Sequence, residues 1–212
     1  SDEIFEFSAE DQFDYSHVML ANGSSWRRNG LGRIHREPIP GLDKLKVFTP
    51  DDIMDGVLVK GRVVVFDDDH FYMGGVLAEK LRREGHDVLL VTPAPDISTW
   101  THKTLEQRKI QKQLMDLGVE LATQTALTAA ETGKVELSCI FTERKIEREC
   151  DSLLLVTERI PNDGLFNSLN GDPERLNNAG IKTLKCIGDS FAPATIAAAV
   201  YSGHLAAIEL QA

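Results

Sequence analysis

Residues 61–91 read GRVVVFDDDHFYMGGVLAEKLRREGHDVLLV, and this stretch decides the fold class. Val63–Phe66 is a short apolar run rich in β-branched residues, which is typical of a buried strand. The segment 74–84 has apolar residues at helical spacing and is followed by Gly85, a common helix stop. Val88–Val91 then predicts a second strand. A strand, a helix and a strand within about thirty residues predict a βαβ unit with a parallel sheet.

Patterns on both sides of this unit predict further elements. Gly164–Gly180 contains Asn-Gly and Asp-Pro pairs, so it is predicted to be the longest loop. Two segments, 135–141 and 145–149, alternate in polarity, as expected of an antiparallel meander. The other expected elements are a strand over 15–20, a helix that begins at Thr49-Pro50, a helix over 104–117, strands over 119–122, 153–156 and 184–187, and a closing helix over 195–210.

Composition excludes several classes of protein. The chain has 212 residues, of which 42% are hydrophobic and 26% are charged, as in ordinary globular domains. Apolar runs such as Val63–Phe66 are far too short to cross a bilayer, and the net charge of −10 repels phosphate backbones and anionic lipids. We therefore expect a cytoplasmic protein whose partners include neither nucleic acid nor membrane. Ser1 opens almost directly onto Ile4–Phe7, so we expect an excised part of a longer chain.

Cysteines and histidines predict no metal site. The three cysteines, Cys139, Cys150 and Cys186, form no CxxC pair and are expected to be reduced thiols. The six histidines lack the H-x₃-H and H-E-x-x-H spacings of zinc ligands, and each is expected at the surface or at a strand edge. No acid–base pair lies at motif spacing, so no catalytic residue is assigned.

The turn after the first strand of the βαβ unit lacks the glycines that a dinucleotide needs. Asp69 and Phe71 stand at the first two glycine positions of a G-x-G-x-x-G motif, with Gly74 at the third. The carboxylates of Asp67–Asp69 are expected to oppose a phosphate, and no basic residue is nearer in sequence than Arg62. We expect a unit that is kept for its shape and binds no NAD. A magnesium site like that of response-regulator receiver domains is excluded because the chain has no Lys-Pro pair.

Three other turns carry a second signal. Tyr15–Gly23 and Cys150–Asn162 share one plan, in which a polar lead-in precedes an apolar strand and a tight polar turn. Cys186–Ser190 reads Cys-Ile-Gly-Asp-Ser and precedes the closing helix. The second segment resembles the D-x-(apolar)-A-T-G-R-x-P-N crossover of flavoproteins with two dinucleotide folds. The first resembles their A-T-G turn, and the third resembles their terminal G-D turn.

Nearly end to end, the chain resembles the C-terminal half of the trimethylamine, dimethylamine and histamine dehydrogenase family, within the wider dienoyl-reductase-type flavoproteins. The matching segments are Ala21–Trp26, Pro38–Gly41, Thr49-Pro50, Met54–Gly56, Phe71–Met73, Leu77–Leu81, Gly85–Val88, Thr104–Glu106, Asp151–Leu153, Ile187–Asp189 and Gly203-His204. The resemblance implies a three-layer α/β fold with parallel sheets and two Rossmann-like dinucleotide-binding units of the FAD/NAD(P)-binding type. It implies an incomplete FAD-like unit over 1–58 and 151–212, and an inserted NAD-like unit over 59–150.

The resemblance also implies where a cofactor binds. In the family, the aspartate of the G-D turn meets the ribityl chain of a flavin, and the following helix points its N-terminus at the cofactor. The cofactor-binding residues carried over are Asn22, Gly23, Trp26, Gly188, Asp189 and Ala192. ADP or FAD is the expected ligand, whereas FMN and a 4Fe-4S cluster are expected only in the N-terminal barrel of the longer protein. Asn22 replaces the family's Thr and Glu158 replaces its Gly, and a Glu there is expected to crowd or repel a dinucleotide.

The implied function is that of the nucleotide-binding-fold part of an FMN and iron–sulfur amine dehydrogenase-like oxidoreductase, inactive in isolation. Two alternatives stay open: a functional NAD(P)H- and FAD-binding electron-transfer module, and a non-enzymatic docking domain for an electron-transfer flavoprotein. The expected partners are the barrel domain of the same polypeptide, an electron-transfer flavoprotein, and further copies in a homo-oligomer. Arg27 and Arg28 are expected to be solvated, with Arg27 also a candidate phosphate contact. Any nucleotide is expected at the FAD-like site rather than beside Asp67–Asp69.

Overall fold

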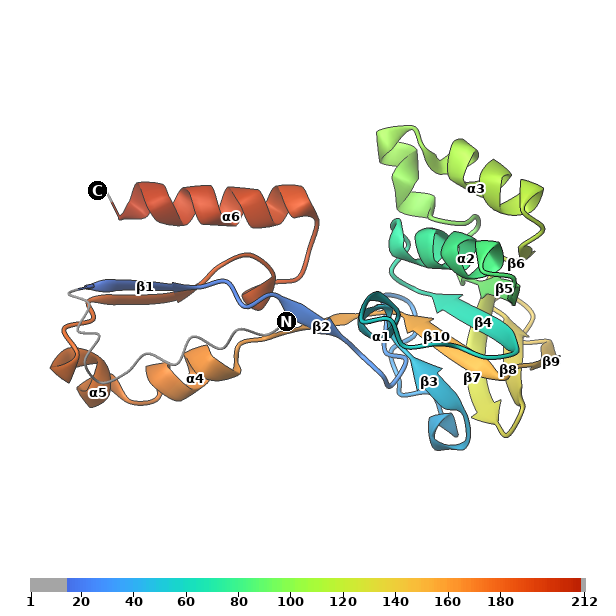
Figure 1. The fold of residues 1–212 in the computed structure, drawn as a ribbon, viewed down its shortest axis with the longest axis horizontal. Coiled ribbons are helices and arrows are strands. Elements are labelled where there is room, and N and C mark those ends of the chain that lie inside the picture. Colours follow the sequence, from blue (N-terminus) through green and yellow to red (C-terminus); the bar gives the residue numbers. More distant parts are fainter. Residues whose placement is uncertain (1–14, 211–212) are drawn as a thin grey trace. The chain divides into compact units, whose positions relative to one another are not determined.

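The structure, a computed structural model, describes residues 15–210 and divides the chain into two compact units. One unit contains the residues up to Ser25 together with those from Ile160 onward, and the other contains Trp26–Arg159. The chain passes from one unit to the other within two short strands that pair with each other, β2 (Ser24–Trp26) and β11 (Arg159–Pro161). Figure 1 shows the elements of both units.

The unit Trp26–Arg159 is built on an open sheet of five parallel strands. In spatial order they are β3 (Lys46–Phe48), β10 (Ser152–Val156), β4 (Arg62–Asp67), β5 (Asp87–Val91) and β6 (Glu120–Ala122). The other elements are η1 (Leu42–Lys44), α1 (Pro50–Met54), α2 (Met73–Arg83), η2 (Thr99–Thr104), α3 (Gln107–Asp116) and an antiparallel meander of β7 (Thr125–Glu131), β8 (Lys134–Cys139) and β9 (Lys145–Glu149). From β4 the chain proceeds to β5 and β6 on one side, while β10 and β3 lie on the other, so the connections diverge at β4.

Both faces of this sheet are covered, which explains why its central strands are continuously apolar. On one face, Val63 and Val65 pack with side chains of α2 and α3. On the other face, Val64 and Phe66 pack with side chains of β7 and β8 (Figure 1). The unit therefore has three layers, with helices, sheet and meander in that order. The predicted α/β class, the parallel sheet and the central βαβ unit are confirmed.

The other unit contains a two-stranded parallel sheet. β1 (His17–Leu20) pairs with β12 (Thr183–Cys186), from His17 opposite Thr183 to Leu20 opposite Cys186. The remaining elements of this unit are α4 (Gly164–Asn170), α5 (Pro173–Asn178), η3 (Gly188–Ser190) and α6 (Ile196–Glu209). Within residues 15–210, no helix has the length and apolar character that crossing a membrane requires.

The predicted loop over Gly164–Gly180 is wrong, because this segment forms α4 and α5. The Asp172-Pro173 pair starts a helix here instead of a loop. The carboxylate of Asp172 accepts the N–H of Arg175 at 3.0 Å, and Pro173 occupies the first turn, where its missing N–H costs no hydrogen bond.

Two further elements differ from the prediction. The helix expected over 104–117 begins only at Gln107, because Leu105 has a φ of 62° and is 92% exposed. A left-handed residue cannot continue a helix. The strand β7 was not predicted, although it pairs with β8 along its length.

The compact units divide the chain between residues 25 and 26 and between 159 and 160. The predicted cofactor units have boundaries near 58 and 150, and those boundaries stay a prediction. The strands β3 and β10 belong to the sheet of the unit Trp26–Arg159, which accounts for the position of the structural division.

Candidate functional site

Five of the six predicted cofactor-binding residues lie at one edge of the β1–β12 sheet. Because these strands are parallel, their carboxyl ends share an edge, and each strand is followed there by a turn. The N–H of Ile187 donates to the carbonyl of Leu20 at 2.9 Å, which brings the two turns side by side. The five residues are Asn22 and Gly23 after β1, and Gly188, Asp189 and Ala192 after β12.

The turn after β1 is held by Asn162. The side-chain Nδ2 of Asn162 donates to the carbonyl of Asn22 at 3.1 Å, and its backbone N–H donates to the carbonyl of Gly23 at 3.0 Å. Its Oδ1 accepts the hydroxyl of Ser25 at 2.9 Å. Gly23 has a φ of 74°, which favours glycine, and a Cβ added there would meet no atom within 4 Å. The turn is thus held through its carbonyl groups and open at Gly23.

The turn after β12 is fixed through Asp189 and Gly188. The Oδ1 of Asp189 accepts the N–H of Ala194 at 3.1 Å, and its Oδ2 accepts the hydroxyl of Ser24 at 3.4 Å. The N–H of Gly188 donates to the hydroxyl of Ser202 on α6 at 3.0 Å. These bonds join the G-D turn to the start of β2 and to α6.

The helix α6 begins close behind this turn and has 14 residues. The hydroxyl of Thr195 caps it by accepting the N–H of Ala198 at 3.4 Å, and the predicted closing helix is confirmed. Its first residue, Ile196, is 85% exposed. The positive end of the helix dipole therefore favours an anion at this edge.

The sixth predicted residue, Trp26, lies in the other compact unit. Its ring packs against the core formed by the sheet and α2, and the guanidinium carbon of Arg159 lies 5.5 Å from the ring centroid. Its backbone N–H donates to Oδ2 of Asp51 at 2.8 Å. The structure thus gives Trp26 packing and hydrogen-bond partners within its own unit.

Arg28 is exposed, as expected, and Arg27 is partly exposed, but both side chains also form ion pairs that were not predicted. Nε of Arg27 lies 2.7 Å from Oε2 of Glu158, and Nη2 of Arg28 lies 2.5 Å from Oδ1 of Asp52. The charge of Glu158, which was expected to repel a dinucleotide, is therefore balanced locally by Arg27.

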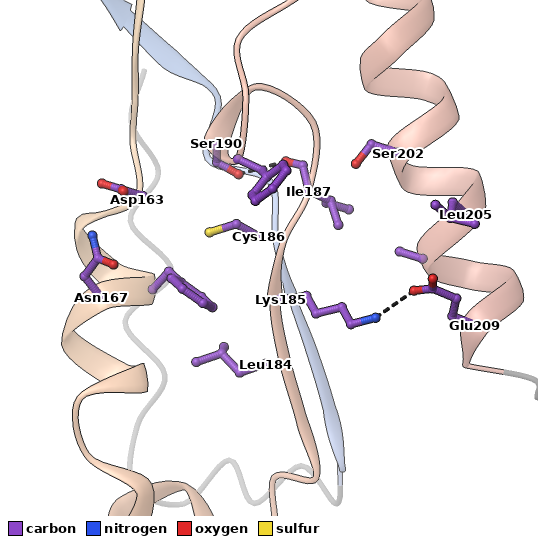
Figure 2. A pocket seen from close by; sticks show the side chains of 13 residues that line it. Asp163, Asn167, Leu184, Lys185, Cys186, Ile187, Ser190, Ser202, Leu205 and Glu209 are labelled. Carbon is purple, nitrogen blue, oxygen red and sulfur yellow. Dashed lines mark hydrogen bonds and ion pairs between the residues drawn. The ribbon is translucent and has the colours of Figure 1, made fainter.

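A pocket of about 550 Å³ opens in the unit that contains β1 and β12, between α4, β12 and α6 (Figure 2). Its lining residues are Asp163, Phe166, Asn167, Leu184, Lys185, Cys186, Ile187, Ser190, Phe191, Ser202, Leu205, Ala206 and Glu209. Figure 2 shows Leu184 and Cys186 on the side of β12 that faces α4. Lys185 points the other way and pairs with Glu209 of α6 at 2.7 Å. Because Ile187 and Ser190 belong to the turn after β12, the pocket adjoins the candidate cofactor edge.

The βαβ turn of the unit Trp26–Arg159 is filled by its own side chains. Asp67 ends β4, is fully buried, and accepts the N–H groups of Asp69 and His70 with Oδ1 at 3.1 and 3.0 Å. A Cβ at Gly74 would lie 2.4 Å from Oδ2 of Asp67, so glycine leaves room for this carboxyl group. Burial raises the pKa of Asp67 to about 7. The carboxyl group sits between the strand end and the helix start, where a phosphate binds in an intact dinucleotide unit.

Asp68 fastens a loop, residues 29–41, to the same turn. Its Oδ2 accepts the N–H groups of Ile34 and His35 at 2.9 and 3.0 Å, and its Oδ1 lies 2.7 Å from Nε2 of His70. Both Asp68 and His70 are buried. A buried carboxylate is stable only when such polar partners replace water, so the loop and the turn form one closed arrangement.

Asp69 adds an ion pair to this arrangement. Nη2 of Arg33 lies 3.1 Å from Oδ1 of Asp69, and Nε of Arg33 donates to the backbone carbonyl of Asp69 at 2.8 Å. The guanidinium carbon of Arg33 lies 4.6 Å from the ring centroid of Trp100 and 5.9 Å from that of Phe71. The loop is therefore held by charge and by stacking as well as by backbone hydrogen bonds.

These contacts correct two expectations about the turn. His70 was expected at the surface or a strand edge, but it is only 3% exposed and is bonded to Asp68. The acids were expected to stand without a nearby cation, but Arg33 comes from 36 residues away in sequence to pair with Asp69. The turn is therefore occupied by protein side chains, in addition to being negatively charged.

Sequence reasoning assigned no role to Asn162 or Arg33. Asn162 was visible as the last residue of the R-x-P-N pattern, but its partner Asn22 lies 140 residues earlier. Arg33 stands in no motif, and only the folded loop brings it to Asp69.

Comparison with known proteins gives the relatives of this fold. A family model described as the OYE-like second alpha/beta domain matches residues 48–153. The chain is 32% identical to dimethylamine dehydrogenase from Hyphomicrobium sp. (strain x), over 94% of this chain and 30% of that protein. Histamine dehydrogenase from Rhizobium sp. 4-9 superposes with a TM-score of 0.91 at 45% identity, over 98% of this chain and 31% of that one. The 6-hydroxypseudooxynicotine amine oxidase of Pseudomonas geniculata N1 superposes with a TM-score of 0.85 at 38% identity, over 90% of this chain and 28% of that one.

The chain therefore spans between 28% and 31% of the length of these three relatives. By their names, the relatives are amine dehydrogenases and an amine oxidase. A 2-naphthoyl-CoA reductase superposes with a TM-score of 0.70 at 17% identity, which shows a shared fold alone. The chain belongs to the family of the OYE-like second alpha/beta domain, and it is related to oxidoreductases of the amine dehydrogenase type.

Proposed function

We propose that this chain is the nucleotide-binding-fold part of a longer amine dehydrogenase-like oxidoreductase, and that it binds ADP or FAD at the carboxyl edge of β1 and β12. The observation that carries this proposal is the meeting of the Asn22–Gly23 turn and the Gly188–Asp189 turn at that edge, where Asp189 also binds Ala194 in the segment that leads into α6. We infer further that the chain contains two Rossmann-like dinucleotide folds with the predicted cofactor-unit boundaries, an incomplete FAD-like fold over 1–58 and 151–212 and an inserted NAD-like fold over 59–150.

The residues at this edge suit an ADP-like ligand. The space beside Gly23 admits a ligand close to the backbone, and the start of α6 favours a phosphate. The carboxylate of Asp189 is an acceptor for ribose or ribityl hydroxyls. Ala192 is small, and its N–H already donates to the carbonyl of Gly188 at 3.0 Å, so it leaves the edge unobstructed.

The filled βαβ turn argues against NADH or NADPH as the ligand. A pyrophosphate there would have to displace the carboxyl group of Asp67 and break the contacts of Asp68 and Asp69 with the loop 29–41. Each of these groups is buried or nearly so, and removing the partner of a buried polar group costs about 1–3 kcal/mol. This free-energy cost would offset part of the free energy that binding of a nicotinamide nucleotide provides.

In this proposal, FMN and a 4Fe-4S cluster belong to a barrel domain of the longer protein. Residues 15–210 contain no group of three or more Cys, His, Asp or Glu side chains placed to hold a metal ion. Burial raises the pKa of Cys150 to about 12, which opposes the thiolate form that an iron ligand requires. We propose that the chain by itself oxidises no amine, and that it acts in the cytoplasm together with the barrel, within a homo-oligomer.

Calorimetric titration of the chain with ADP, FAD, NADH and NADPH tests the proposal. ADP or FAD should bind, Asp189→Asn should weaken that binding, and Asp69→Lys should leave it unchanged. NADH binding in the micromolar range that Asp69→Lys abolishes would instead support a functional NAD(P)H module and overturn the assignment. Absence of ADP and FAD binding would overturn it as well.

A second candidate function is docking of an electron-transfer flavoprotein, and the net charge of −10 favours it. An acidic surface steers a basic partner, so association should weaken as salt concentration rises. The measurement is the affinity of the longer protein for an electron-transfer flavoprotein, with and without this part, at two salt concentrations. Equal affinity without this part would rule out docking here.

A further inference from the structure

We propose that Asn162 is the positioning residue of the nucleotide site, and that it aims the backbone N–H of Gly23 at a phosphate oxygen of the ligand. The inference rests on the proposed function, because it assigns atoms within that site. Asn162 contacts the turn after β1 with both its side chain and its backbone.

Asn162 fixes the direction in which the peptide groups of this turn point. Its Nδ2 holds the carbonyl of Asn22 at 3.1 Å, and its backbone N–H holds the carbonyl of Gly23 at 3.0 Å. In a planar trans peptide, the carbonyl and the N–H point in opposite directions. The carbonyl of Asn22 and the N–H of Gly23 share one peptide group. The N–H of Gly23 therefore points away from Asn162.

This N–H is free to meet a ligand. Within the part of the chain that the structure describes, the N–H groups of Asn22 and Gly23 donate to no protein acceptor. A Cβ added to Gly23 would meet nothing within 4 Å, so a phosphate can approach closely. Backbone N–H groups in such turns form anion-binding concavities.

The charged side chains that follow this turn in sequence leave this role to the backbone. The two arginines that follow the turn are already paired, Arg27 with Glu158 at 2.7 Å and Arg28 with Asp52 at 2.5 Å. Asp189 is linked to the residue after Gly23 through the hydroxyl of Ser24, at 3.4 Å. A phosphate is therefore expected on the Gly23 side of the edge, with the sugar hydroxyls on the Asp189 side.

The test compares ADP with adenosine, because only the first has phosphates. Asn162→Leu keeps the size of the side chain, adds no charge and removes both of its side-chain hydrogen bonds. Ser25→Ala removes only the contact with Ser25, and Asn170→Leu makes the same change at an exposed asparagine that ends α4. Asn162→Ser gives a second, milder variant in case the leucine variant does not fold. Dissociation constants are measured by calorimetry, and the Gly23 amide resonance is followed by NMR.

In the wild-type chain, ADP should bind about tenfold more tightly than adenosine, the size expected of one hydrogen bond to a charged group. It should also shift the Gly23 amide. Asn162→Leu should bring the two affinities to within about twofold of each other while adenosine binding stays unchanged, and both controls should keep the wild-type ratio.

Three outcomes would overturn the proposal. If Asn162→Leu weakens ADP and adenosine equally, its role is structural only. If Asn162→Leu changes neither affinity, the phosphate is held elsewhere, and the proposed function stands without this assignment. If the wild-type chain binds no ADP, the proposed function and this inference fall together.

Discussion

Replacing Asp67 by asparagine tests whether the filled turn holds a proton near neutral pH. Asp67 is fully buried, and this burial raises its pKa from 3.8 to about 7. The folded chain therefore keeps a proton that the unfolded chain releases near pH 4. The stability from this group is complete below the unfolded pKa and is lost as the pH rises toward 7. Wild-type chain should thus be less stable at pH 8 than at pH 5.

The size of this loss follows from the pKa values. A rise of about three units at 1.36 kcal/mol per unit gives about 4 kcal/mol in total, of which about 2–3 kcal/mol falls between pH 5 and pH 8. Asparagine has the shape of the protonated acid. Its Oδ1 can still accept the N–H groups of Asp69 and His70, which the wild-type oxygen meets at 3.1 and 3.0 Å. Because asparagine does not ionise, the free energy of unfolding of Asp67→Asn should lack this part of the pH dependence.

The assay is urea unfolding followed by tryptophan fluorescence at pH 5, 6, 7 and 8. Subtracting the unfolding free energy of the variant from that of the wild type removes the contributions that the two chains share. The difference should change by about 2–3 kcal/mol in favour of the variant as the pH rises. Asp116→Asn, an exchange at an exposed position on α3, should follow the wild type at every pH. Parallel curves for wild type and Asp67→Asn would refute the reasoning.

Three other experiments test separate parts of the fold. Gly74→Ala places a Cβ against the carboxyl group of Asp67, and it should lower the free energy of unfolding in urea by about 1–3 kcal/mol. An unchanged free energy of unfolding would contradict this close packing. Thr195→Ala removes the cap of α6 and should lower the free energy of unfolding by about 1 kcal/mol in thermal unfolding. Thr195→Asp should retain most of the stability that the cap provides. In thiol labelling at pH 8, Cys139, whose pKa the hydroxyl of Thr142 lowers, should react before the buried Cys150, and equal rates by mass spectrometry would contradict this order.

The central βαβ unit could be predicted from the sequence because its local signals agree with one another. β-Branched residues fill Val63–Phe66, helical spacing covers 74–84, and Gly85 stops the helix. The observed β4, α2 and β5 each lie within one residue of the expected bounds at both ends. These elements depend on neighbouring residues, which a sequence displays directly.

Contacts between distant segments could not be predicted in this way. Nothing near Asp69 in sequence indicates that Arg33 will neutralise it, and nothing near Asn22 indicates that Asn162 will hold its carbonyl. The charge argument therefore identified the residues that fill the turn, but it did not foresee the pairing of Arg33 with Asp69. A local feature was also missed at Leu105, whose φ of 62° interrupts an apolar spacing that favours a helix.

The closed arrangement around β4 also makes a phosphate site hard to build here one residue at a time. Placing glycine at Asp69 would leave the guanidinium of Arg33 without its counter-ion, and changing Asp68 would leave the N–H groups of Ile34 and His35 without an acceptor. Each single substitution lowers stability before it can add affinity for a nucleotide. Engineering nicotinamide binding into this domain therefore means redesigning the loop 29–41 and the turn together.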